Sequence, residues 1–160
     1  MDDSLRFADL YRRHAADVYR FAYWLSGSKA EADDFTAEAF ARALAGADDL
    51  RPLTVKGFLF TIVRNLHASA HRAPREVALD DAVEHADPAA GPEELVIARE
   101  RLAFTVEALA RLPLTDRAAL LMRAEGGLAY EEIAEALGIS VGNAKVKVHR
   151  ARAKLVALNI

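Results

Sequence analysis

YEEIAEALGISVGNAKVKVHRAR, residues 130–152, shows the strongest structural pattern in the chain. Apolar residues recur at helical spacing on both sides of Gly138, which predicts two short amphipathic helices joined by a glycine turn. The second helix carries five cations and no acidic residue as far as Lys154. A helix-turn-helix with a basic second helix is typical of duplex DNA binding. A solvated basic helix in a protein–protein module is the alternative, but it leaves the pairing of glycine turn and charge asymmetry unexplained.

The first turn of this basic helix is placed where a recognition helix meets base edges in the major groove. Ser140 is expected to cap the helix, because a serine hydroxyl at the N-cap accepts a hydrogen bond from a first-turn backbone amide. We expect the cations behind this turn to reach phosphates or bases. The residues predicted to contact duplex DNA are Val141, Gly142, Asn143, Lys145, Lys147, His149, Arg150 and Arg152.

A second basic segment lies upstream of the helix-turn-helix. Residues 51–75 hold five cations and no acid, as do residues 140–160, whereas residues 76–139 hold 14 acidic and five basic groups. The net charge of −3 therefore hides two positive segments, which predicts two nucleic-acid surfaces and acidic surface elsewhere. A helix with scattered cations is often only a solvated face, so nearby rings matter: Phe60 and one of Tyr23 or Trp24 are candidates to stack on exposed bases.

Helical periodicity continues through the rest of the chain, and no alternating β pattern longer than a few residues appears. The predicted helices are residues 7–25, a second from a Ser28 cap to Gly46, a third from about Thr54 to before Pro74, then 93–111, one capped by Thr115, 130–137 and about 141–157. The chain is therefore predicted to be all-α, with two small helical domains, residues 1–73 and 93–160. Residues 74–92 are acidic and interrupted by proline and glycine, which predicts a flexible linker.

Several classes of protein are excluded or disfavoured. The 160 residues include no cysteine, so disulfides and thiolate metal sites are impossible. No apolar run approaches the roughly 18 residues that span a bilayer, and the N-terminus is acidic rather than an export signal. We therefore expect a cytoplasmic protein without membrane insertion.

No catalytic or metal-binding constellation is predicted. The chain lacks a glycine-rich phosphate loop, a G-x-S-x-G turn and an HExxH motif, so we expect neither enzymatic activity nor a cofactor. His67 and His71 have the spacing of a metal pair on a helix. A third ligand is missing from the cationic segment around them, which predicts that no metal is bound there.

The order of these patterns resembles a bacterial RNA polymerase sigma factor of the extracytoplasmic-function (ECF) type of the sigma-70 family. Residues 7–25 (FADLYRRHAADVYRFAYWL), 30–44 (AEADDFTAEAFARAL) and 58–72 (FLFTIVRNLHASAHR) resemble region 2, and residues 109–155 resemble region 4. The resemblance covers almost the whole chain. It implies a transcription initiation factor that binds core RNA polymerase and promoter DNA, is controlled by an anti-sigma factor and is a monomer when free.

The resemblance also implies roles for single residues. The acidic second helix is similar to the surface that docks on the clamp helices of the polymerase, and the third helix is similar to the segment that recognises and opens the minus-10 element. The basic C-terminal helix resembles the reader of the minus-35 element. The implied polymerase contacts are Asp33, Asp34, Phe35, Glu38 and Phe40, and the implied minus-10 contacts are Arg64, Asn65, His67, His71 and Arg72, with Phe60 as a stacking ring.

The chain departs from the family pattern at a few positions. Phe58 stands where the family often has Trp, Ala129 replaces a Ser or Thr cap, and Asn143-Ala144 replaces Thr-Val. Two other functions stay open: a sigma-like decoy that binds an anti-sigma factor without recognising promoters, and a dimeric repressor. The intact cations of both basic segments argue against a decoy, and the region 2 resemblance argues against a repressor.

Overall fold

The computed structural model describes residues 3–46, 55–71 and 91–158, which form seven helices and no strand. The all-α prediction is therefore confirmed. Arg72 and residues 74–90 of the predicted linker lie outside the described residues, whereas Gly91 and Pro92 belong to the start of the fourth helix. The helices are α1 (Asp3–Ser26), α2 (Lys29–Ala45), α3 (Val55–Ala70), α4 (Pro92–Ala110), α5 (Leu114–Ala124), α6 (Tyr130–Leu137) and α7 (Val141–Ala157).

Local capping fixes the start of α2, the end of α6 and the start of α7. The Ser28 hydroxyl accepts a hydrogen bond from the Glu31 amide at 3.2 Å, and the Ser140 hydroxyl accepts one from the Asn143 amide at 3.0 Å. Gly138 has a φ of 67°, the left-handed conformation that glycine adopts at little cost, and it ends α6. The predicted cap at Thr115 is wrong, because α5 begins at Leu114 with Pro113 in the N-cap position.

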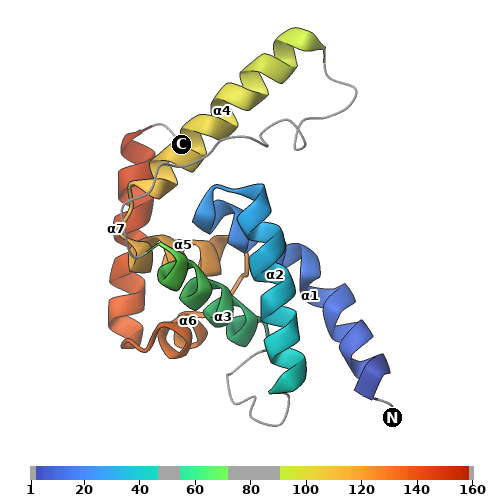
Figure 1. The fold of residues 1–160 in the computed structure, drawn as a ribbon. Coiled ribbons are helices and arrows are strands. Elements are labelled where there is room, and N and C mark those ends of the chain that lie inside the picture. Colours follow the sequence, from blue (N-terminus) through green and yellow to red (C-terminus); the bar gives the residue numbers. More distant parts are fainter. Residues whose placement is uncertain (1–2, 47–54, 72–90, 159–160) are drawn as a thin grey trace.

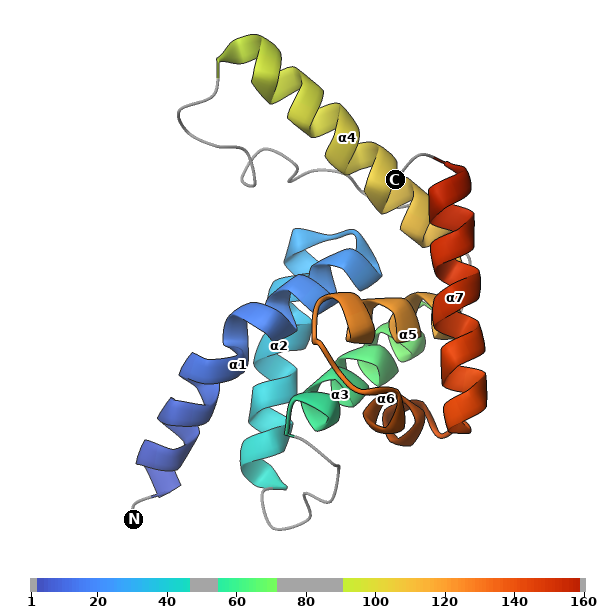
Figure 2. The same cartoon turned by 180° about the vertical axis from the view of Figure 1, so that it is seen from behind.

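The first three helices pack together as one group. In Figures 1 and 2, α1 and α2 lie side by side and α3 crosses next to them. Their apolar stripes face one another and bury Phe21, Leu25, Leu59 and Val63 almost completely. The ring of Phe21 stacks on that of Phe60 with 4.3 Å between the ring centroids and an interplanar angle of 4°. Both rings of this stacked pair are completely buried.

The C-terminal helices form a second group. Helix α7 packs against α5 and α6, with Met122, Ile133 and Val148 fully buried between them. The N-terminal half of α4 extends away from the rest of the protein (Figures 1 and 2). None of the described helices combines the length and the apolarity that crossing a bilayer requires.

The two groups also pack against each other. Helix α3 lies against α5 and α6, and α1 lies against α4 and α5. The Lys56 ammonium donates to the Gly126 carbonyl at 3.2 Å, and Arg117 donates to the Leu25 carbonyl at 2.6 Å. A Cβ atom at Gly126 would lie 2.4 Å from the Phe60 ring, so the backbone there passes directly over that ring. One continuous apolar core therefore extends through both groups.

Candidate nucleic-acid interface

Helix α7 presents its polar residues on the outside of the protein. Its inner stripe, Ala144, Val148 and Ala151, is buried against α5 and α6, because these residues recur at steps of four and three. Of the residues predicted to contact duplex DNA, Val141 and Lys147 are half-buried, and the exposed ones are Gly142, Asn143, Lys145, His149, Arg150 and Arg152. Six of the eight predicted residues are thus exposed on the outer side of α7.

Two of these cations have an internal partner that the sequence did not reveal. The Asp116 carboxylate on α5 is only 1% exposed, and it lies 3.3 Å from the Lys147 ammonium and 3.7 Å from the Arg150 guanidinium. A buried carboxylate needs such partners, because its charge is poorly solvated. The expectation that every cation of α7 is available to phosphate is therefore wrong for Lys147, whereas the side chain of Arg150 remains about half exposed. Asp116 stands in the first turn of α5, where acidic residues are common on any helix, so its burial could not be read from the sequence.

The supporting helix α6 keeps part of its capping. Ala129 offers no side-chain acceptor, but its amide donates to the Glu132 carboxylate at 3.2 Å. That bond is one half of a capping box, and the hydroxyl half is absent. The Tyr130 ring lies between two cations, with Arg123 at 4.6 Å and the Lys145 ammonium at 5.8 Å from its centroid. The ring therefore also helps to hold Lys145 at the start of α7.

Helix α3 differs from the expectation at two positions. Phe60 is fully buried and stacked on Phe21, so it is not available to stack on a base in this conformation. His67 is 6% exposed and likewise faces the interior. Of the residues within α3 that were predicted to contact the minus-10 element, the accessible ones are Asn65, which is exposed, and Arg64, which is half-buried and donates to the Asn65 amide oxygen at 3.1 Å.

The aromatic side chains at the end of α1 offer little stacking surface. Tyr23 is 4% exposed and packs edge-on to Trp24, with 5.4 Å between ring centroids. Trp24 is half-buried and is the more accessible of the two rings. Between Tyr23 and Trp24, which the sequence did not separate, burial therefore favours Trp24 as a stacking surface.

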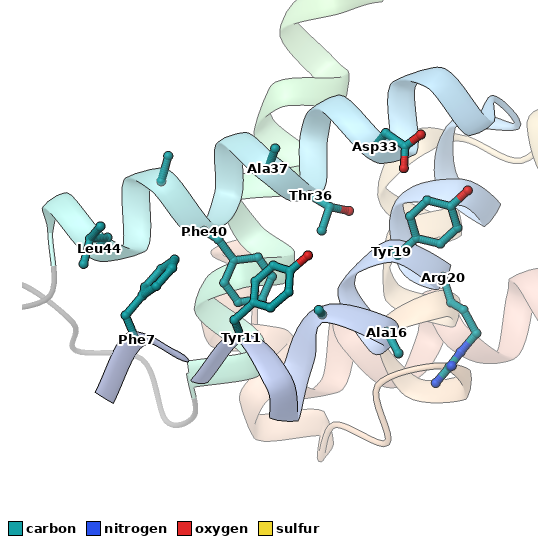
Figure 3. Close-up of a pocket in the computed structure, with 12 residues that line it drawn as sticks. Phe7, Tyr11, Ala16, Tyr19, Arg20, Asp33, Thr36, Ala37, Phe40 and Leu44 are labelled. Carbon is teal, nitrogen blue, oxygen red and sulfur yellow. The ribbon is translucent and has the colours of Figure 1, made fainter. Parts of the chain in front are cut away.

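A groove of about 820 Å³ runs between α1 and α2 (Figure 3). Its floor is aromatic: the Phe40 ring lies 4.9 Å from that of Tyr11 and 6.3 Å from that of Phe7, centroid to centroid. Figure 3 shows Leu44 at one end of the groove and Asp33 at the other. The groove therefore offers a partner an apolar floor with an acidic group at one end.

The groove contains only part of the predicted polymerase-contact set. Asp33 and Phe40 line it, and Asp34 and Glu38 are exposed on α2, where Glu38 is paired with Arg42 at 2.9 Å. Phe35 is buried, and its ring lies 6.2 Å from that of His67, so it packs inward. Sequence reasoning did not predict that α1 contributes to this groove, although the aromatic residues Phe7 and Tyr11 near the start of that helix could have indicated it.

Three potential metal ligands meet where α2 begins and α3 ends. Glu31, His67 and His71 each offer a ligand atom within 4.8 Å of the other two. His71 Nε2 and the Glu31 carboxylate are hydrogen-bonded at 2.7 Å. Burial, followed by the nearby His71 and Arg117, lowers the pKa of His67 to about 3, so its imidazole is neutral at pH 7. The premise that a third ligand is missing is therefore wrong, because α2 supplies it.

Comparison with known families covers both helix groups. Residues 10–76 match the family model of sigma-70 region 2, and residues 105–155 match that of sigma-70 region 4. The chain is similar to the ECF RNA polymerase sigma factor SigE of Mycolicibacterium smegmatis, with 36% identity over 92% of this chain and 59% of that protein. It is also similar to the ECF RNA polymerase sigma factor EcfG of Rhodopseudomonas palustris, with 37% identity over 99% of this chain and 86% of that protein.

Solved structures resemble the whole arrangement. CnrH, in complex with the cytosolic domain of CnrY, aligns with a TM-score of 0.72 and 27% identity over 95% of this chain and 86% of that one. The sigma factor RpoE of Bartonella quintana, in complex with the anti-sigma factor NepR, aligns with a TM-score of 0.72 over 96% of both chains. The identity to RpoE is 24%, so this second match supports the fold alone.

Proposed function

Because the chain belongs to the extracytoplasmic-function sigma factors of the sigma-70 family, we propose that it binds core RNA polymerase and directs the enzyme to promoters through a minus-10 and a minus-35 element. Members of this family are initiation factors and not enzymes. In this proposal residues 1–73 bind polymerase and the minus-10 element, residues 93–160 bind the minus-35 element, and residues 74–92 connect them.

The exposed face of α7 carries the proposal for the minus-35 element. Its capped first turn leaves Gly142 and Asn143 exposed, where a helix in the major groove meets base edges. Lys145 and Arg152 are exposed behind that turn and are placed to meet phosphates. The buried Asp116 carboxylate restrains Arg150, whose guanidinium is still about half exposed. Because the Arg150 side chain is already restrained, it loses less conformational entropy when it contacts DNA.

The proposal for the minus-10 element relies on fewer residues than the sequence suggested. Arg64 and Asn65 form a polar pair on α3, and Trp24 at the end of α1 offers a partly exposed ring. Opening a duplex costs a few kcal/mol per flipped base, which contacts to the separated strand must offset. We propose that these three residues supply such contacts in this chain.

The groove between α1 and α2 supports the proposal for core polymerase. A helical partner that lays an apolar residue against Tyr11, which is 47% exposed, would cover the aromatic side of the groove, where the Phe40 ring is already buried beneath it. The acidic residues on the neighbouring surface, Asp33 and Asp34, favour a basic partner. Apolar burial with charge complementarity is the arrangement expected of a specific protein interface.

An anti-sigma factor is proposed as the regulatory partner. CnrH, which matches 95% of this chain at 27% identity, is bound to the cytosolic domain of CnrY in its solved structure. A sigma-like decoy would share such a partner without needing promoter contacts. The exposed cations of α7 favour the sigma factor over the decoy, because a decoy has no use for a surface complementary to phosphate.

Reconstitution with core polymerase tests the proposed function. The purified chain, bound to core polymerase of its own host, is expected to be retained on a pre-melted fork of a promoter mapped from transcript starts after its overexpression. Lys145→Ala and Arg150→Ala are expected to weaken retention, and each lost phosphate contact should reduce the salt slope by about 0.9. Arg99→Ala, which removes an exposed cation on α4, is the matched control and should change neither.

Polymerase binding without specific retention on the fork would indicate a decoy. Retention that both α7 variants leave unchanged would show that α7 is not the recognition helix.

A further inference from the structure

The cluster of Glu31, His67 and His71 joins the start of α2 to the end of α3, and Glu31 and His71 are 40 residues apart in the sequence. Glu31 lies in the first turn of α2, where the Ser28 cap fixes its backbone. His67 lies in the last turn of α3 and His71 directly follows the helix, so the two imidazoles share one face at a spacing of four residues. Their ring centroids are 4.3 Å apart. The fold, rather than the sequence spacing alone, completes a set of three.

His67 is buried although one of its ring nitrogens has no hydrogen-bond partner among the described residues, which is unusual. The side chain is 6% exposed, and among the described residues its Nδ1 atom finds no hydrogen-bond partner. Buried polar atoms in native proteins are usually satisfied, and an exception calls for a ligand, a water molecule or a functional role.

We propose that Glu31, His67 and His71 bind one Zn²⁺ ion. Two imidazole nitrogens and one carboxylate oxygen form a ligand set that zinc accepts, and water completes four-coordination. Zinc bonds of about 2.0–2.1 Å place neighbouring ligand atoms about 3.3 Å apart in a tetrahedron. The Glu31–His71 pair is now at 2.7 Å and all three atoms lie within 4.8 Å, so side-chain movements of about an ångström complete the site.

The site would link the start of α2 to the end of α3. Glu31 and His71 are each about one-fifth exposed, which leaves the ion a route from solvent. One carboxylate offsets only part of the divalent charge, and Arg117 on α5 raises the electrostatic cost on the side of His67. Moderate rather than extreme affinity is therefore expected. The zinc proposal does not depend on the proposed function, since it concerns only the contact between two helices.

Zinc titration of the full chain tests the site. After treatment with EDTA and dialysis, the protein is titrated with ZnSO₄ in a calorimeter, and its melting temperature is measured with and without the metal. We expect one Zn²⁺ per chain and a Tm that rises with zinc concentration, because an ion that binds only the folded chain stabilises it. Co²⁺ should show the visible absorption of a four-coordinate site.

Two ligand variants and one control locate the ion. His71→Ala and Glu31→Gln should each weaken binding by at least about 100-fold, since even changes outside the ligand shell cost 10–100-fold. Glu31→Gln keeps a hydrogen-bonding oxygen beside His71, so it separates metal binding from the existing hydrogen bond. His149→Ala removes an exposed imidazole from α7 and should leave binding unchanged. Circular dichroism confirms that each variant is folded.

Two results would overturn the proposal. Zinc that does not bind stoichiometrically, or leaves the Tm unchanged, would mean that the cluster is a hydrogen-bonded pair beside a buried histidine. Stoichiometric binding that both ligand variants retain would place the ion elsewhere on the chain. Neither result would bear on the polymerase retention assay, which uses different residues.

Discussion

Helices α3 and α7 lie in basic segments with the same number of cations, but the fold buries α3 more than α7. Residues 51–75 and 140–160 each hold five cations and no acid. Helix α7 packs on one side only and presents most of its cations to solvent. Helix α3 lies between α1 and α2 on one side and α5 and α6 on the other, so Phe60 and His67 are buried. Charge composition therefore did not predict how much of a helix a partner can reach.

The two helices also treat their cations differently. Lys56 on α3 is paired with Asp17 at 2.9 Å and donates to the Gly126 carbonyl, so it joins the two helix groups. On α7, only Lys147 and Arg150 approach an acid among the described residues, and that acid is buried beneath them. The proposed DNA contact of α7 therefore keeps most of its cations available, whereas Lys56 on α3 is held by contacts within the protein.

The largest effect is expected from truncating the stacked ring of α3. Phe60→Ala should lower the free energy of unfolding by about 3–5 kcal/mol, because it removes a fully buried ring and leaves a cavity against Phe21. Phe58→Ala, at a half-buried position of the same helix, should cost clearly less. Urea unfolding of the two variants measures the difference. If both variants lost the same small amount of unfolding free energy, Phe60 would not be a buried core residue and could again be a candidate to stack on a base.

Asp116→Asn probes the anchor of α7. The substitution is expected to cost about 1.5–3 kcal/mol, because it weakens charge-assisted contacts of a carboxylate that is almost fully buried. It should also strengthen duplex binding, since Lys147 becomes available to phosphate. Each added phosphate contact should steepen the salt dependence by about 0.9.

A matched control for Asp116 is Glu107→Gln, which removes an exposed pair with Arg111 worth at most about 1 kcal/mol. Thermal unfolding and a salt titration of duplex affinity compare the two variants. A loss at Asp116 no larger than that at Glu107 would contradict the anchoring role.

Gly126→Ala probes the close packing over α3. Its new Cβ atom would lie 2.4 Å from the Phe60 ring and 2.7 Å from the Met122 carbonyl, so overpacking of about 1–3 kcal/mol is expected. Gly142→Ala adds the same methyl group in open space on α7 and should stabilise the helix by about 0.5–1 kcal/mol. Opposite signs in chemical denaturation would support the contrast, and two stabilised variants would refute the close contact.

Ala129→Ser probes the cap of the supporting helix α6. The new hydroxyl can complete the capping box with Glu132 and should stabilise the support of α7 by about 1 kcal/mol. Ser140→Ala removes an existing cap from α7 itself and should cost a similar amount. The two variants should therefore shift the melting temperature in opposite directions. Shifts in the same direction would show that these caps do not determine the stability of α6 and α7.

Helix boundaries were largely predictable because their causes are local. The serine caps at Ser28 and Ser140 and the left-handed Gly138 act within a few residues, and α6 and α7 begin and end as expected. The start of α5 was placed too late, because Thr115 is a good capping residue but Pro113 already takes the N-cap position. The family resemblance is likewise confirmed, since it depends on the order of such local patterns.

The candidate site was predictable only in part, for a different physical reason. Periodicity places a residue on a helix face, but it does not say how many neighbours cover that face. The burial of Phe60 depends on the backbone at Gly126, and the salt bridge of Lys147 depends on Asp116. In both cases the partner is distant in sequence, so neither local propensity nor spacing could reveal it.

The amino-acid order alone was enough to specify an all-α chain, the ends of most helices and the family, because hydrogen-bonded caps, glycine turns and apolar periodicity act over a few residues. Packing of the two helix groups determined which side chains a partner can reach, and it brought Glu31 next to His67 and His71. Burial and the meeting of charges from distant helices depend on how whole surfaces fit together, and side-chain packing is a property of the folded protein rather than of any single segment.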